Sequence, residues 1–275
     1  MNGTLAQMVA LTCHGNALIG DFEHPRFYPE NSTCQFCDSI KFVIFKKPLI
    51  GKIKELIVAD NPDDWLASLK NRGVTGLRLG RTPKNDPQFP DRMSAGLVGG
   101  GGTWTLEVVH AGGTSEFWAA RWLVWNQNAP ERKIWRVSYC LIESTKTKPQ
   151  NLRNVSDVKV DLWRALSEIR EFSGQQKCDN FTLFFTKALD ALDHPEMEAA
   201  YHKDLYVPGT LNDDAAAILK AATSAWVFGA MGSWNDMGFA GDIQKEYERV
   251  SENLFQVLNE AIAVAATSSF PSGRG

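Results

Sequence analysis

Two arginines, Arg121 and Arg136, are the residues whose types and positions best suit the binding of a small ligand. They belong to consecutive segments that are predicted to be extended, and antiparallel pairing would place them opposite or diagonal to one another on one face. Glu107, in the preceding extended segment, is the expected acidic partner. Paired guanidinium groups suit carboxylate or phosphate, so one interpretation is an anion-binding pocket. The other is an ion-paired cluster that binds no ligand.

Two further ionisable residues, His110 and Glu116, would extend such a pocket into a cleft beside the glycine run 99–102. An extended segment follows that run, and the Gly-Lys-Ser/Thr ending of a phosphate-binding loop is missing, so the run predicts a hairpin or a flexible loop. The corresponding functional hypothesis is an enzyme that acts on an anionic small molecule in a cleft lined by the two arginines and Glu107.

A second candidate site is a metal site near the N-terminus, where Cys34 and Cys37 form a C-x-x-C pair. Thiol and imidazole groups that precede the pair could complete the tetrahedral set that zinc prefers; they are Cys13, His14 and His24. Neighbours on an extended chain point to opposite sides, so only one of Cys13 and His14 would bind the same ion. The alternatives are a redox pair, or small apolar thiols buried in a reducing compartment. No cofactor is predicted, and zinc stays an open alternative.

Tryptophan is concentrated in the two segments that carry the arginines, and this concentration predicts a hairpin. Both faces of the first segment, 116–125, are mainly apolar, which indicates a strand covered on two sides. An antiparallel register with odd residue sums, such as Trp122 opposite Trp135 and Trp118 opposite Tyr139, gathers the aromatic rings into one cluster. Even sums would scatter them, so the odd register is favoured.

The chain up to residue 147 is predicted to be mainly strand. Its short segments of β-branched and aromatic residues, bounded by Gly, Pro or Asn, are 40–45, 74–79, 103–109, 116–125 and 133–142. One helix near 61–72 interrupts them, because Asn61 can cap it, Pro62 suits its first position and Gly73 follows its last turn.

Beyond the polar stretch 144–151, apolar residues recur at helical spacing. Four helices are predicted, from a cap at Asn154 to before Gly174, from Asp179 to before Pro195, after Asn212 through Trp226, and over about 242–265. The glycine-broken aromatic segment 229–239 lies between the last two. It is expected either to pack under the helices or to form a lip that binds a partner.

These patterns predict an α+β protein, with a Trp-rich, mainly antiparallel sheet followed by a helical bundle or a helical layer. The expected division is a β-rich domain over 1–147 and a helical domain over 153–268, which share one continuous core if the helices cover the strands. The net charge of −3 divides into +4 for residues 1–149 and −7 for 150–275. This asymmetry is compatible with the two halves docking on one another.

The composition is that of a water-soluble protein, with 44% hydrophobic and 22% charged residues and no apolar stretch long enough to span a bilayer. The N-terminal segment lacks the features of a signal peptide, and an odd number of cysteines suits a reducing compartment, so a cytoplasmic protein is expected. Nucleic acid is not an expected partner, because the lysines between residues 41 and 54 are typical of one face of an exposed strand. Abundant packing signals and sparse catalytic ones favour a non-catalytic binding or regulatory protein, with a protein or an anionic small molecule as partner.

Overall fold

The structure is a computed structural model that describes residues 1–23, 25–46, 52, 54–84, 86, 88–148, 153–194, 196–199, 201–229 and 231–271. Its strands are β1 (Cys37–Lys46), β2 (Lys54–Ala59), β3 (Val74–Thr82), β4 (Thr103–His110), β5 (Thr114–Val124) and β6 (Trp135–Lys146). Its α-helices are α1 (Gly3–Ile19), α2 (Pro62–Asn71), α3 (Asp91–Ser94), α4 (Val155–Gln175), α5 (Asp179–Asp193), α6 (Asp213–Ala225) and α7 (Gly241–Thr267).

The strands form one sheet in the order β2-β1-β6-β5-β4-β3. Neighbours pair antiparallel except β1 and β6, which pair parallel in the middle of the sheet. The predicted α+β class is confirmed, with a mixed sheet followed by helices. Sequence periodicity could not reveal the parallel pair, because the partners are separated by four other strands in the chain.

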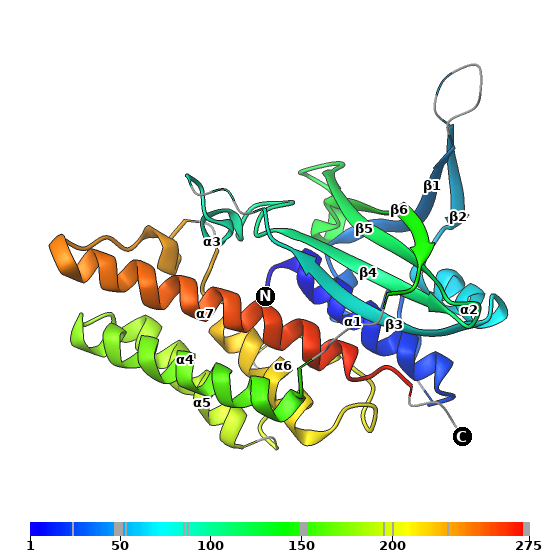
Figure 1. The fold of residues 1–275 in the computed structure, drawn as a ribbon. Coiled ribbons are helices and arrows are strands. Elements are labelled where there is room, and N and C mark those ends of the chain that lie inside the picture. The colour runs from blue at the N-terminus through cyan, green and yellow to red at the C-terminus, as the bar shows by residue number, and fades with distance from the viewer. Residues whose placement is uncertain are drawn as a thin grey trace.

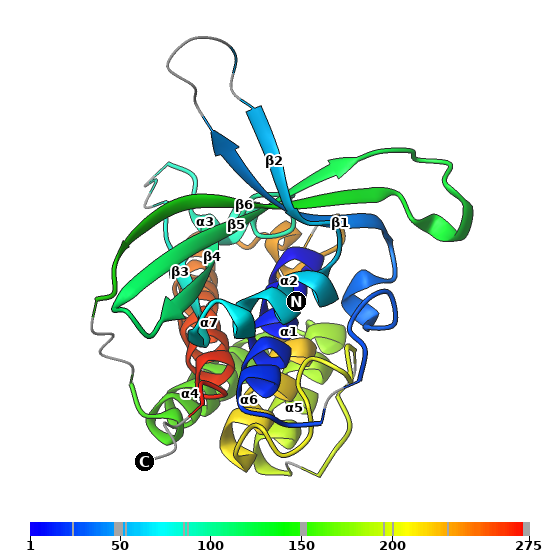
Figure 2. The same cartoon turned by 90° about the vertical axis from the view of Figure 1, so that its right-hand side faces the viewer.

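Helices α1, α2 and α7 lie beneath one face of the sheet, and α4, α5 and α6 form a further layer below them (Figures 1 and 2). The covered face is aromatic. The ring of Phe42 stacks on those of Trp65 and Tyr139 at centroid distances of 4.1 and 4.9 Å, and Trp118 meets Trp65 edge to face at 5.9 Å. Aromatic pairs of this kind stabilise a core beyond the area they bury. In the described part of the chain, no helix covers the opposite face of the sheet (Figure 2).

The register of β5 with β6 has the predicted odd parity over most of its length. Trp122 faces Val137 rather than Trp135, so the pairing is displaced by two residues from the predicted example. The rings of Trp122 and Trp135 still meet as diagonal neighbours, at 5.8 Å between centroids. A shift of two residues preserves which side chains share a face, so the rings stay on one face as predicted, although Trp118 and Tyr139 meet through Phe42 rather than directly.

Helix α1 was missed by the sequence reasoning. Every residue from Leu5 to Ala17 is buried, so the helix has no polar stripe and lacks the amphipathic period by which a surface helix is recognised. It begins at the cap of Asn2, whose side chain accepts a hydrogen bond from the amide of Leu5. It runs between the sheet and the C-terminal helices (Figure 2). Gly15 permits its close approach to β3, because a Cβ there would lie 2.3 Å from the side chain of Leu77.

The outer edge of β3 is covered by side chains of two helices. The amide group of Asn16 on α1 accepts from the Leu77 amide at 2.6 Å and donates to the Leu77 carbonyl at 2.9 Å. The hydroxyl of Thr267 on α7 accepts from the amide of Leu79 at 3.0 Å. These side chains replace a neighbouring strand, and an edge that is satisfied in this way is not available for pairing with another chain.

Candidate functional site

The two arginines that the sequence singles out lie on the uncovered side of the sheet. Arg121 faces Ser138 and Arg136 faces Leu123, so the guanidinium groups are diagonal neighbours, and both side chains are exposed. Arg136 donates to Asp38 at 2.8 Å, and its guanidinium carbon lies 3.5 Å from the centre of the Trp125 ring. The two arginines share a face as predicted. Their side chains are exposed to solvent, however, rather than covered by a core.

Glu107 has different partners from those expected. Its carboxylate is buried, accepts from the Ser115 hydroxyl at 2.7 Å and lies 3.7 Å from a guanidinium nitrogen of Arg78. The residue opposite Glu107 on β5 is Phe117, and Arg121 is four residues further along that strand, which corresponds to about 13 Å. The predicted pairing of Glu107 with the arginines is therefore wrong, because the register puts these groups at different levels of the sheet.

Glu116 and His110 do come together, beside α2. The carboxylate of Glu116 lies 3.3 Å from His110 Nε2 and accepts from the indole of Trp118 at 3.1 Å. Arg72, at the end of α2, also binds this carboxylate. Sequence reasoning missed Arg72, although a cation at a helix C-terminus was a usable signal. Both oxygens of the Glu116 carboxylate are occupied by donors of the protein itself. These contacts therefore connect α2 to the hairpin formed by β4 and β5.

The cysteine and histidine residues considered for zinc lie apart or have other contacts. Cys37 Sγ accepts from the side-chain amide of Gln7 at 3.7 Å, whereas Cys13 faces the backbone of α7. The imidazole of His14 lies 3.0 Å from the carbonyl of Asp204, and His24 lies outside the described residues. Within the described ranges, no group of three or more His, Cys, Asp or Glu side chains is arranged to hold a metal ion.

We expect the thiols to be largely unreactive in the folded protein. Burial raises the pKa of Cys13 to about 12 and that of Cys37 to about 11, and it also raises the pKa of Cys34, so the reactive thiolate is scarce at neutral pH. Of the five free cysteines, Cys140 alone is partly exposed. Titration with Ellman's reagent should therefore modify Cys140 first and the other four only on unfolding in urea. Rapid native modification of two or more thiols would contradict this expectation.

One Ser-His-Asp cluster is present where the segment after α5 meets the N-terminal region. The Ser32 hydroxyl lies 2.9 Å from His202 Nδ1 and 2.5 Å from one Asp204 oxygen, and the Ser32 amide donates to the other Asp204 oxygen at 2.6 Å. In a catalytic triad the carboxylate orients the imidazole. Here both carboxylate oxygens bind Ser32, so the cluster serves to fasten two segments together.

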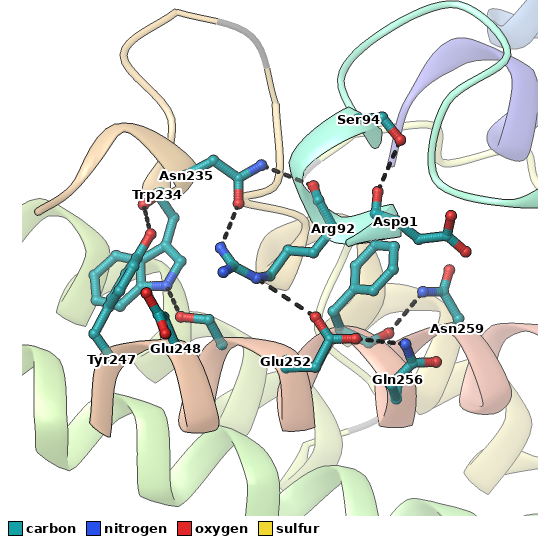
Figure 3. A network of polar contacts seen from close by, with 12 residues as sticks. Asp91, Arg92, Ser94, Trp234, Asn235, Tyr247, Glu248, Glu252, Gln256 and Asn259 are labelled. Atoms are coloured by element: carbon teal, nitrogen blue, oxygen red, sulfur yellow. Dashed lines mark hydrogen bonds and ion pairs between the residues drawn. The ribbon is translucent and has the colours of Figure 1, made fainter. Parts of the chain in front are cut away.

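A larger polar network connects the sheet to the C-terminal helices and was not predicted (Figure 3). Its centre is α3, where Asp91 and Arg92 are buried. The guanidinium of Arg81 on β3 donates to Asp91 at 2.7 Å, and Arg92 donates to the side chain of Asn235 at 2.9 Å. Arg92 Nε lies 3.7 Å from a carboxylate oxygen of Glu252 on α7. The network joins a basic part of the N-terminal half to the acidic C-terminal half.

The glycine run 99–102 supports this network from the sheet side. The amide of Gly101 donates to the Ser94 hydroxyl at 2.9 Å, and the carbonyl of Gly101 accepts from Arg81 Nε at 2.9 Å. A Cβ at Gly100 would lie 1.8 Å from the carbonyl oxygen of Ser94. The loop is therefore a glycine-dependent support for α3, whereas the sequence predicted a hairpin or a flexible loop.

Replacing Gly100 by Ala should lower the free energy of unfolding by about 1–3 kcal/mol, because the added methyl group must displace the backbone of α3. Gly112→Ala is the matched control, since a Cβ at Gly112 meets no atom within 4 Å, and it should cost less than about 0.5 kcal/mol. Urea unfolding of both variants measures the difference. Equal stability of the two variants would show that the loop is not packed in this way.

A groove of about 690 Å³ opens beside the network, between α3 and α7. Its lining residues are Pro83, Asp86, Pro90, Asp91, Arg92, Met93, Glu248, Glu252 and Gln256. Four of these carry carboxylates and one carries a guanidinium. Arg81 pairs with Asp91, and Arg92 lies near Glu252, which leaves Asp86 and Glu248 with no ion pair among the described residues. The groove is consequently acidic, with apolar walls formed by the prolines and Met93.

The chain matches no protein-family model, no curated protein and no solved structure. None of the helices in the described part of the chain combines the length and the apolar composition that crossing a membrane requires. The candidate site is therefore defined by its own geometry. Two signals in the sequence could have pointed to it: the Asp91-Arg92 pair beside two prolines, and the apolar, glycine-broken segment that contains Asn235.

Proposed function

We propose that the protein is a non-catalytic binding protein whose groove between α3 and α7 receives a cationic, partly apolar segment of a partner protein. The observation that carries the proposal is the groove itself, in which acidic side chains outnumber the one guanidinium and share the lining with Pro83, Pro90 and Met93. Carboxylates favour ammonium or guanidinium groups, and apolar walls favour the aliphatic stems of the same side chains.

The buried charges of the network support a rigid binding surface. Arg92 is held between Asn235 and Glu252, and its guanidinium also lies 5.5 Å from the ring of Tyr247 (Figure 3). Since Arg92 is held by these contacts, it balances Glu252 and leaves the charges of Asp86 and Glu248 available to a ligand. A preformed site loses little conformational entropy on binding.

The enzyme hypothesis has less support. It requires two arginines and Glu107 to line one cleft, whereas the arginines are exposed on the sheet and Glu107 is buried with Ser115. The negative charge of the groove also favours a cationic ligand, whereas the enzyme hypothesis requires an anionic one. A cationic segment is therefore the preferred partner, rather than an anionic small molecule.

The test uses a fluorescein-labelled peptide of alternating Lys and Leu residues, with a peptide of alternating Glu and Leu for comparison. Fluorescence anisotropy at low salt should detect binding of the first peptide only. The double variant Asp86→Asn/Glu248→Gln should bind it about tenfold more weakly, which corresponds to about 1.4 kcal/mol. The variant Glu23→Gln/Glu30→Gln has the same net charge as Asp86→Asn/Glu248→Gln but alters exposed acids outside the groove. Its affinity for the peptide should therefore equal that of the wild type.

Two results would overturn the proposal. One is equal binding of the Lys and Glu peptides, which would show that the groove does not select charge. The other is an equal loss of affinity in both double variants, which would show that net charge rather than the groove attracts the peptide. Circular dichroism spectra should be the same for all variants, because none of the four acids forms a buried ion pair among the described residues.

A further inference from the structure

The β1–β2 hairpin projects from the body of the molecule (Figures 1 and 2). β2 is the outermost strand, and Leu56, Ile57 and Val58 on it are 41%, 50% and 38% exposed. The opposite edge of the sheet is covered by Asn16 and Thr267, as described above. Within the described ranges, no side chain covers the outer edge of β2 in that manner. An exposed apolar strand at a sheet edge is typical of a surface that contacts another protein chain.

One face of this hairpin is cationic. Lys46 is directly opposite Lys54, and the next pair on the same face is Ile44 opposite Leu56. Glu55 pairs with Phe45 and so lies on the other face. Like charges directly opposite one another on neighbouring strands destabilise a hairpin. A partner that brings carboxylates between the two lysines would remove this repulsion.

We propose that this cationic face, made by Ile44, Lys46, Lys54 and Leu56, docks into the acidic groove between α3 and α7 of a second copy of the chain. The inference rests on the proposed function, because it names the occupant of the same groove. Both lysines are exposed, and the groove offers Asp86 and Glu248 without ion pairs among the described residues. Leu56, which is 41% exposed, supplies the apolar surface that Pro83, Pro90 and Met93 would cover, and Ile44 adds only the part of its side chain that does not pack on the core.

Such a contact is head to tail, since it joins two different surfaces of the same chain. Contacts of this type are not closed by a two-fold axis, and they produce rings or open chains of subunits. In Figure 1, α3, which forms one wall of the groove, lies well apart from the β1–β2 hairpin, so one copy can use both surfaces at once. We therefore expect species larger than a dimer as the protein concentration rises.

Sedimentation velocity over a concentration series tests the inference. The wild type should sediment faster as concentration increases, whereas Lys46→Glu/Lys54→Glu and Asp86→Lys/Glu248→Lys should each associate at least about tenfold more weakly, because like charges then meet. An equimolar mixture of the two variants should recover association, since the acidic hairpin of one then suits the basic groove of the other. The control Lys148→Glu/Lys187→Glu carries the same charge change outside the hairpin and should behave like the wild type.

The outcomes separate the two proposals. A wild type that stays monomeric throughout, or a mixture that fails to recover association, overturns the inference. If the Lys and Leu peptide still binds the groove in that case, the proposed function stands and only the occupant is wrong. If the peptide fails to bind and the wild type is monomeric, both proposals fail. Unchanged circular dichroism spectra of the variants are required, so that loss of association is not loss of folding.

Discussion

Replacing Arg81 by Ala is expected to lower the free energy of unfolding by about 3–5 kcal/mol, although the site lies in no enzyme-like cleft. The side chains of Arg81 and Asp91 are 9% and 5% exposed, and their charged atoms are 2.7 Å apart. Removing the guanidinium leaves the Asp91 carboxylate buried without its cation. The same change also removes the hydrogen bond to Gly101 and the contact of Arg81 with the Phe255 ring at 5.2 Å.

Urea unfolding followed by circular dichroism measures this loss. The matched control is Arg164→Ala, because Arg164 forms an ion pair with Asp161 at 3.4 Å but is 71% exposed. Exposed pairs contribute about 0–1 kcal/mol, so this variant should be nearly as stable as the wild type. The double variant Arg81→Ala/Asp91→Ala should be more stable than Arg81→Ala alone, since it no longer buries an unpaired charge. A loss below about 1 kcal/mol for Arg81→Ala would contradict the burial of this pair.

Trp234→Ala is expected to have a similarly large effect, of about 3–5 kcal/mol. The Trp234 side chain is fully buried and its indole donates to Ser251 at 2.7 Å. Its ring meets Phe181 and Phe185 of α5 edge to face, at centroid distances of 5.0 and 5.5 Å. Truncation would leave a cavity at the meeting point of α4, α5 and α7, and it would remove a hydrogen bond from a buried hydroxyl.

Met231→Ala is the control for Trp234→Ala. Met231 lies three residues earlier in the same segment but is 99% exposed, so its truncation should change stability by less than about 0.5 kcal/mol. Thermal unfolding followed by intrinsic fluorescence would be confounded by the loss of an indole, so circular dichroism is the appropriate signal. Similar losses for both variants would show that the segment does not anchor the helices through Trp234.

Most elements were predictable because their ends carry local signals. The helix after Asn61 begins with Pro62 and ends at Asn71, and α4 begins directly after the cap of Asn154. The strands of the tryptophan-rich hairpin were predictable because β-branched and aromatic residues are bounded by turn residues. β2 was missed, since its apolar residues form one short consecutive run rather than an alternating pattern, and the strand is exposed over most of its length.

The candidate site was not predicted, because its residues come from distant parts of the chain and the two local signals beside it do not show that they meet. Arg92 and Asn235 are 143 residues apart and carry no shared pattern. Arg81 and Asp91 resemble ordinary surface charges in the sequence, and only the folded arrangement of β3, α3 and the glycine run buries them. Conversely, Arg121 and Arg136 attracted attention because an apolar strand was expected to bury both faces, whereas one face of the sheet is open. The alternative in which the segment 229–239 packs under the helices agrees with the burial of Trp234.

The central position of α1 has a consequence for the way in which the protein folds during its synthesis. The side-chain amide of Asn16 donates to Ser269 at 2.8 Å, across 253 residues, so an early segment depends on a very late one for its surroundings. In a nascent chain, the apolar surface of α1 must therefore stay uncovered until α7 has left the ribosome. We expect folding of high contact order, completed after translation, with α1 as the segment that molecular chaperones bind in the meantime.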